Sequence, residues 1–115
     1  MTALIENEKI LIKKLRNDIG VTRKTFCRLL PVSERLLADL ETAKRPLSDT
    51  VSREINELNR LTSALKKVIE PTYLAEWLST PNRAFEGLKP IEVIERGEVD
   101  RIWRMIYALE SGLPT

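Results

Sequence analysis

The residues that most often carry catalysis or bind metal ions are scarce in this chain. Its 115 residues include no histidine and one cysteine, Cys27. A zinc site generally needs several Cys or His ligands, and a Cys/His nucleophile pair needs a histidine base. The four glycines are dispersed, so no glycine-rich motif that cradles phosphate is present. We therefore predict no catalytic residues, no metal and no cofactor. An enzyme built on Asp, Glu, Lys or Tyr alone is the remaining catalytic alternative.

Positive charge is modestly concentrated in one part of the chain, which is where an anionic ligand would bind if the protein binds one. The net charge is only +2. Residues 1–47 contain ten Lys and Arg against six Asp and Glu, whereas residues 48–115 contain nine against eleven. An anionic polymer such as nucleic acid would therefore dock on the first of these regions.

The overall composition is that of a soluble globular protein, with 43% hydrophobic and 31% charged residues. No apolar run approaches the roughly 20 residues that a membrane span requires. Glu6 and Glu8 interrupt the apolar residues near the N-terminus, so we predict no signal peptide. A single cysteine fits a reducing compartment, and we expect a cytoplasmic protein with no membrane partner.

Apolar residues recur at three- and four-residue steps through most of the sequence, which predicts an all-α fold. Gly20 should end the first helix, Thr22 should cap the second, and Ser33 should cap the third. The longest helix should begin at Ser48 or Asp49 and run to about residue 69. Its apolar stripe is longer than one small lobe needs, so we expect a homodimer or a larger oligomer.

Residues 21–45 combine a capped helix, a small residue at the helix contact, a short turn and a second capped helix. Thr22, Cys27, the turn 30–32 and Ser33 occupy these places in order. The segment resembles the core of an Xre-type helix-turn-helix, whose second helix enters the major groove of DNA. The resemblance implies contacts with phosphates or base edges by Arg23, Lys24, Ser33, Glu34, Arg35, Ala38, Asp39, Lys44 and Arg45.

Two features depart from this pattern. Pro31, whose φ is fixed near −65°, stands where the turn commonly has a residue with positive φ. The expected exposed face also carries Glu34, Asp39 and Glu41, and carboxylates repel phosphate. A helix-turn-helix kept for dimerisation, or a simple corner in a helical bundle, would share these features.

The last third of the chain contains many residues that favour turns or helix ends. Pro81 and Asn82 predict a tight turn, and Pro90 predicts a helix start. Gly97 and Gly112 predict helix ends. The side chains expected to form a small core here are Trp77, Phe85, Ile91, Ile94, Ile102, Ile106 and Leu109. Trp103 and Tyr107 lie four residues apart on the last helix, and we expect one of the two to contact a partner.

From about Leu65 onward, a set of turn, helix-end and apolar residues keeps a fixed order and spacing: Trp77–Leu78, Thr80–Pro81–Asn82, Ala84–Phe85, Gly87, Pro90, Ile94, Gly97, Ile102 and Glu110–Ser111–Gly112. In these residues the sequence resembles the toxin-binding domain of the Xre/MbcA/ParS-type antitoxins. It implies a cognate toxin of the RES type, which degrades NAD or transfers ADP-ribose, and whose NAD pocket the last helix and the residues after it obstruct. The residues implied to contact the toxin are Asn82, Trp103, Tyr107, Glu110, Ser111, Gly112, Leu113, Pro114 and Thr115.

Together these observations predict an all-α protein with a helix-turn-helix region over residues 1–64 and a toxin-binding region over residues 65–115, joined by the long helix. The leading interpretation is a bacterial antitoxin of a type II toxin–antitoxin pair that also represses its own operon. The alternative is an Xre-type transcriptional regulator without a toxin partner. A growth-inhibiting protein encoded next to this one, and co-purifying with it, would distinguish the two.

Overall fold

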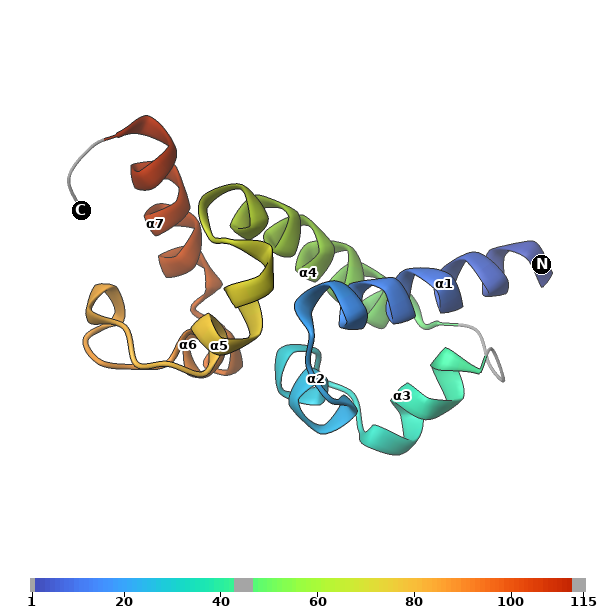
Figure 1. The fold of residues 1–115 in the computed structure, drawn as a ribbon. Helices are drawn as coiled ribbons and strands as arrows, with labels where there is room; N and C mark the ends of the chain where they lie inside the picture. Colours follow the sequence, from blue (N-terminus) through green and yellow to red (C-terminus); the bar gives the residue numbers. More distant parts are fainter. Residues whose placement is uncertain (1, 43–46, 113–115) are drawn as a thin grey trace. The chain divides into compact units, whose positions relative to one another are not determined.

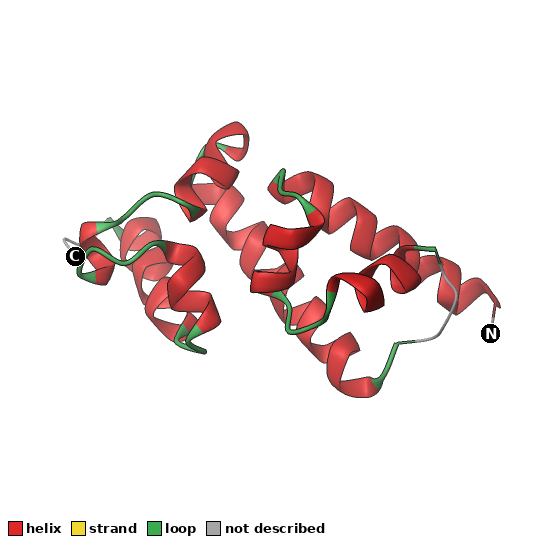
Figure 2. Cartoon of the chain, turned by 90° about the horizontal axis from the view of Figure 1, so that it is seen from below, coloured by secondary structure: helices red, strands yellow, loops and turns green. Residues whose placement is uncertain are grey.

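The computed structural model describes residues 2–42 and 47–112, and the regular structure of these residues is entirely helical (Figures 1 and 2). The all-α prediction is therefore confirmed. No helix in these two ranges is both long and apolar enough to cross a membrane. The elements, in chain order, are α1 (Thr2–Ile19), α2 (Arg23–Leu29), α3 (Glu34–Glu41), α4 (Asp49–Val68), the 3-10 turn η1 (Pro71–Tyr73), α5 (Leu74–Leu78), the 3-10 turn η2 (Arg83–Phe85), α6 (Pro90–Glu95) and α7 (Val99–Ser111).

The chain divides into two compact units, Met1–Arg60 and Leu61–Thr115. The boundary falls inside α4, so this helix contributes to both units. α4 begins at Asp49, one of the two starts expected, and Ser48 precedes it with its Oγ accepting a hydrogen bond from the amide of Val51 at 3.2 Å. The functions that the sequence assigns to residues 1–64 and 65–115 stay predictions.

The first unit, unit 1, buries one apolar face of each of its helices. Both α1 and α2 pack against α3. Phe26 and Leu37 are fully buried at the centre of this arrangement. Among residues 11–42 and 47–60, the other buried apolar residues are Ile12, Leu15, Ile19, Leu29, Leu30, Leu40, Ile55 and Leu58.

Local hydrogen bonds explain where α2 and α3 begin. The Thr22 Oγ1 accepts from the amide of Thr25 at 3.2 Å, and the Ser33 Oγ accepts from the amide of Leu36 at 3.0 Å. Each bond satisfies an amide that has no partner within the first turn of its helix. Both predicted caps are thus confirmed.

Pro31 is accommodated in the turn between α2 and α3 without a positive φ. Leu30 is extended, with φ −129° and ψ 121°, and its carbonyl accepts a hydrogen bond from the Val32 amide at 2.7 Å. This bond spans two residues, as in an inverse γ-turn, and the φ that proline imposes fits the centre of such a turn. The turn between α2 and α3 therefore differs from the one that the helix-turn-helix pattern commonly has, since none of residues 30–32 has a positive φ.

The second unit, unit 2, has its own core. Phe85 and Ile102 are buried at its centre, and Trp77 packs edge-on against Phe85 with ring centroids 6.3 Å apart. Trp77 and Ile94, which the sequence places in the core, are only half-buried and lie against it. The buried members of this core are Leu61, Leu65, Leu74, Phe85, Val93, Ile102 and Ile106.

A closed loop over residues 82–88 connects α5 to α6 and carries η2. The Asn82 side chain accepts a hydrogen bond from the Ala84 amide at 2.9 Å, as the sequence predicts. The Asn82 amide in turn donates to the Leu88 carbonyl at 3.0 Å, which joins the two ends of the loop. The chain reverses through Glu86 and Gly87, with φ of 57° and 88°. This loop places η2 beside α7.

Candidate functional site

Two large hydrophobic residues of α7, Tyr107 and Leu109, are exposed. Tyr107 is 61% exposed, and its ring stacks on Trp103 with centroids 5.9 Å apart and planes inclined by 30°. Trp103 is half-buried and packs against the core of unit 2. It therefore lies between this core and the ring of Tyr107. One member of the predicted aromatic pair is thus anchored in the fold, and the other is presented to solvent.

The prediction that Leu109 belongs to the core is wrong, because Leu109 is 50% exposed. Its place on the helical stripe of Ile102 and Ile106 is as expected, but Ile106 is the last buried residue of α7. Figure 1 shows the C-terminal end of α7 running away from α5 and α6. The last turn therefore carries Leu109 beyond the core of unit 2.

The residues that follow Tyr107 in the predicted toxin contact are presented at this end of α7. Glu110, Ser111 and Gly112 are exposed, and Gly112 ends the helix with a φ of 73°. The Ser111 hydroxyl donates to the Ala108 carbonyl at 3.1 Å, so it is tied to its own helix. Leu113, Pro114 and Thr115 lie outside the described residues. Asn82, the remaining predicted contact, is half-buried in the loop beside α7.

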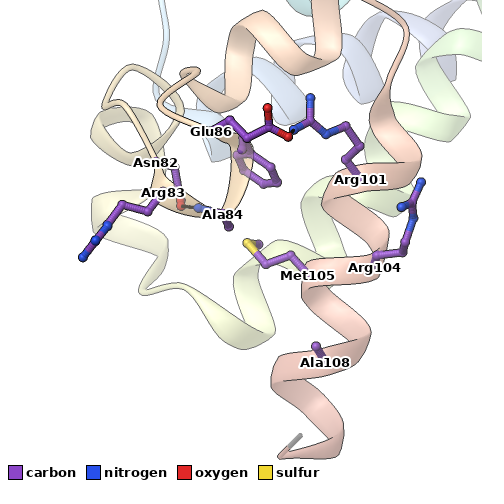
Figure 3. A pocket seen from close by; sticks show the side chains of 9 residues that line it. Asn82, Arg83, Ala84, Glu86, Arg101, Arg104, Met105 and Ala108 are labelled. Atoms are coloured by element: carbon purple, nitrogen blue, oxygen red, sulfur yellow. Dashed lines mark hydrogen bonds and ion pairs between the residues drawn. The ribbon is translucent and has the colours of Figure 1, made fainter. Parts of the chain in front are cut away.

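An open pocket of about 810 Å³ lies between this loop and α7 (Figure 3). The side chains of Ala84, Phe85, Met105 and Ala108 give it an apolar floor. The charged and polar residues that line it are Asn82, Arg83, Glu86, Arg101 and Arg104. The sequence pattern did not single out this pocket, because its two sides are about 20 residues apart and no motif connects them.

Arg101 holds one edge of the pocket in place. Its guanidinium lies 2.9 Å from the Glu98 carboxylate and 3.5 Å from that of Glu86, and 5.9 Å from the centroid of the Phe85 ring. Such a cation–π contact and ion pair join α7 to η2. Arg101 is therefore mainly a structural residue of this edge.

Arg104 and Arg83 are the more accessible cations of the pocket. Arg104 donates to the carboxylate of Asp100 one turn earlier, and this hydrogen bond lowers the pKa of Asp100. Both side chains of that pair are mostly exposed, so the pair contributes little to stability and can exchange partners. Figure 3 shows Arg83 and Arg104 directed outward on opposite sides of the pocket.

In unit 1 the structure corrects the expected position of Glu41. The sequence placed it on the exposed face of α3, but it is fully buried. Its carboxylate accepts hydrogen bonds from Arg16 Nε at 2.7 Å and from Arg23 Nε at 3.0 Å. Burying a carboxylate is costly unless it is paired and hydrogen-bonded, and two guanidinium groups meet that requirement here.

This ion network changes the interpretation of Arg23, which the sequence assigns to a DNA phosphate. Its side chain is 48% exposed, but its guanidinium is engaged by Glu41. Lys24, next to it at the start of α2, is exposed. Lys24 is therefore the freer of the two cations at this helix end.

Four further residues of the predicted DNA contact, Glu34, Arg35, Ala38 and Asp39, lie at helical spacing on one side of α3. Glu34 and Arg35 are exposed, and Ala38 and Asp39 are half-buried beside them. Ser33 is exposed as well, but its hydroxyl caps the helix. Lys44 and Arg45 fall outside the described residues.

Cys27 is half-buried in α2, and its thiol is poorly suited to nucleophilic chemistry. Burial raises the pKa of Cys27, and the carboxylates of Glu34 and Glu41 raise it further. A raised pKa keeps the thiol protonated at neutral pH, whereas the thiolate is the reactive form. Among the described residues no group of three or more His, Cys, Asp or Glu side chains could hold a metal ion.

Comparison with known proteins identifies similar chains. No protein-family model matches the sequence. The sequence is 26% identical over 96 residues to the mycobacterial cidal antitoxin MbcA of Mycobacterium bovis, which covers 83% of this chain and 84% of the relative. MbcA of two Mycobacterium tuberculosis strains matches to the same extent.

The fold is also similar to a solved structure. A chain in the crystal structure of the M. tuberculosis MbcT–MbcA toxin–antitoxin complex superposes with a TM-score of 0.75. The match covers 93% of this chain and 96% of that chain, at 21% sequence identity. The match therefore includes most of the residues of each unit.

Proposed function

We propose that this protein is an antitoxin that binds a cognate toxin through the exposed face of α7. The observation that carries this proposal is the likeness to MbcA along most of the chain, in sequence and in fold. The exposed Tyr107, stacked on an anchored Trp103, supplies a suitable contact in unit 2. Aromatic side chains of this kind are frequent hot spots of protein interfaces.

The mechanism we propose is steric obstruction by binding. No nucleophile, base and oxyanion donor are brought together among the side chains described above, and a presented helix end needs no chemistry to block an entrance. Following the family resemblance, we infer that the partner is a RES-type toxin that acts on NAD. The end of α7, from Tyr107 to Gly112, would then cover the mouth of the toxin's NAD pocket, together with residues 113–115.

We further propose that unit 1 binds operator DNA and represses the antitoxin's own operon. The capped helices α2 and α3, joined by a tight turn, support this proposal. Lys24 would contact the DNA backbone, and Arg35 would contact base edges from the exposed face of α3. Because helix-turn-helix proteins generally act as two-fold dimers, we expect a homodimer, which light scattering would detect.

The experiment that tests the central proposal is co-expression with the product of the adjacent gene. We expect that product to inhibit growth when it is expressed alone, and to co-purify with this protein and lose its toxicity when the two are expressed together. A neighbour that neither inhibits growth nor binds would reject the antitoxin proposal. Specific binding to upstream DNA in that case would favour the alternative, an Xre-type regulator without a toxin partner.

A further inference from the structure

The pocket between η2 and α7 has the composition of a receptor for a short segment of another protein. Its floor is apolar, because Met105 points toward Ala84 across it and Ala108 lies one turn further along α7 (Figure 3). It is open to solvent, so a side chain can enter without displacing an element of the fold. An aliphatic or small aromatic side chain placed here would bury apolar surface on both partners.

The charges around the pocket define what can flank such a side chain. Three arginines line it, Arg83, Arg101 and Arg104, against one carboxylate, that of Glu86. Glu86 and Glu98 already engage Arg101. The charge that remains for a ligand therefore lies on Arg83 and Arg104, which flank the pocket on opposite sides. Both are exposed, and no ion pair of Arg83 is found among the described side chains, those of residues 11–42 and 47–112.

The backbone on the η2 side of the pocket has a strained conformation at Glu86, which is consistent with a preformed site. Glu86 is the one non-glycine residue with positive φ in the described ranges. Such a conformation costs free energy and persists only where the surroundings maintain it. Here the hydrogen bond between the Asn82 amide and the Leu88 carbonyl, which closes the loop, maintains it. The η2 side of the pocket is thus held at a set position beside α7.

The pocket is also continuous with the proposed toxin-binding face. Arg104 lies three residues before Tyr107 and four before Ala108, so on α7 it separates the aromatic pair from the pocket. A partner that covers Tyr107 would therefore also reach the pocket.

We propose that this pocket binds an acidic segment of the toxin, in which an apolar side chain is flanked by carboxylates. The apolar side chain packs on Met105, Ala84 and Ala108, and the flanking carboxylates pair with Arg83 and Arg104. In forming the complex Arg104 exchanges Asp100 for the carboxylate of the partner. This proposal rests on the proposed antitoxin function, which it extends by a second contact site and by the chemistry of the toxin surface.

The first test measures affinity and association rate for the purified cognate toxin. The double variant Arg83→Gln/Arg104→Gln removes both charges from exposed side chains, so its thermal stability should stay near that of the wild type. We expect about a tenfold loss of affinity, with slower association and a weaker dependence on salt. Ala84→Gln, which fills the pocket without a change of charge, should also weaken binding. Arg96→Gln, an exposed arginine of the same unit outside the pocket, is the matched control and should bind normally.

The second test identifies the partner group directly. Arg83→Lys and Arg104→Lys introduce amines that a carbodiimide can couple to a carboxylate in contact with them. We expect mass spectrometry to find cross-links from these lysines to Asp or Glu residues of the toxin that neighbour an apolar residue. Arg96→Lys should give none.

The outcomes separate this proposal from the one on which it rests. Failure of the wild-type protein to bind the toxin would reject both proposals. Normal toxin binding by the double variant and by Ala84→Gln would overturn the pocket proposal alone. Binding of inorganic phosphate to the wild type but not to the double variant, with unchanged toxin affinity, would assign the pocket to a free anion and would also overturn it.

Discussion

At the level of single residues, the sequence assigns Arg23 to a DNA phosphate, yet its guanidinium is bound to the buried Glu41. Arg16 from α1 binds the same carboxylate, so the three side chains join α1, α2 and α3. Because α1 and α2 both pack on α3, this network acts at the centre of unit 1. Substitution of Arg23 would therefore perturb the fold as well as any DNA contact, which makes Lys24 and Arg35 the better probes of DNA binding.

We predict that Glu41→Gln destabilises the protein by about 1–3 kcal/mol. The substitution removes the negative charge that two guanidiniums surround, and breaking a buried ion pair leaves the partner charge uncompensated. The effect stays below the largest values known because both arginines are partly exposed and can be hydrated. Urea unfolding measures the change, with Glu54→Gln on the exposed side of α4 as control, for which less than about 0.5 kcal/mol is expected. Equal unfolding midpoints for the two variants would show that the network contributes nothing.

We predict that Tyr107→Ala weakens toxin binding by about 2 kcal/mol, or roughly thirtyfold, and leaves stability almost unchanged. The ring is mostly exposed, so its loss leaves no cavity in the free protein. Calorimetric titration with the toxin, together with thermal unfolding of the free variant, tests both parts. Tyr73→Ala is a suitable control because Tyr73 is 42% exposed in η1 of the same unit. Equal affinities of the two variants would remove Tyr107 from the interface.

At the level of elements, the helix ends follow from local chemistry. The side chains of Thr22, Ser33 and Ser48 each accept a hydrogen bond from the backbone amide three residues later. Such a bond depends only on residues close together in the sequence. The turn of Asn82 has the same origin. For this reason the boundaries of α2, α3 and α4 could be predicted closely from the sequence.

We predict that Ser33→Ala destabilises the protein by about 1 kcal/mol, because the cap of α3 is lost. Ser33→Asp should restore stability, since aspartate is also a good cap, but it places negative charge at the start of the proposed recognition helix. The Asp variant should therefore unfold like the wild type and bind operator DNA more weakly. Thermal unfolding and a DNA-binding titration provide the two measurements. A Ser33→Ala variant as stable as the exposed mid-helix variant Ser63→Ala would contradict the role of the cap.

Features that depend on contacts between distant segments could not be predicted in the same way. Whether a carboxylate on a helix is buried depends on whether cationic partners elsewhere in the chain can pair with it. For Glu41 one such partner is Arg16, which is 25 residues away in the sequence. Leu109 continues an apolar stripe correctly, but the length of the core beneath α7 is set by α5, α6 and the end of α4. The arginine-lined pocket requires η2 and α7 to be adjacent, which no local pattern encodes. The features that the sequence mispredicted or missed are therefore those that depend on tertiary contacts.

At the level of the whole molecule, each of the two units has a core of its own and carries its own candidate surface. Leu37 and Phe26 are buried within unit 1, whereas Ile102 and Ile106 belong to the core of unit 2. The face of α3 and the end of α7 thus rest on separate sets of packed side chains. Substitutions of exposed residues in one unit should leave the folding of the other unchanged, because effects of distant, independent sites are usually additive.

We predict that DNA binding and toxin neutralisation can be removed independently. The double variant Lys24→Ala/Arg35→Ala removes two exposed positive charges from unit 1 and spares the Glu41 network. It should bind operator DNA more weakly, with a smaller salt dependence, because fewer phosphate charges are neutralised. It should still protect cells that express the toxin, since α7 is unchanged.

Tyr107→Ala should behave in the opposite way, with normal DNA binding and reduced protection. The measurements are a salt series of operator titrations and growth rescue at matched antitoxin levels. Expression of both variants from a plasmid with an independent promoter prevents loss of repression from changing the dose. If Lys24→Ala/Arg35→Ala lost protection at equal protein levels while Tyr107→Ala kept it, the toxin would bind unit 1, and the assignment of neutralisation to α7 would be wrong.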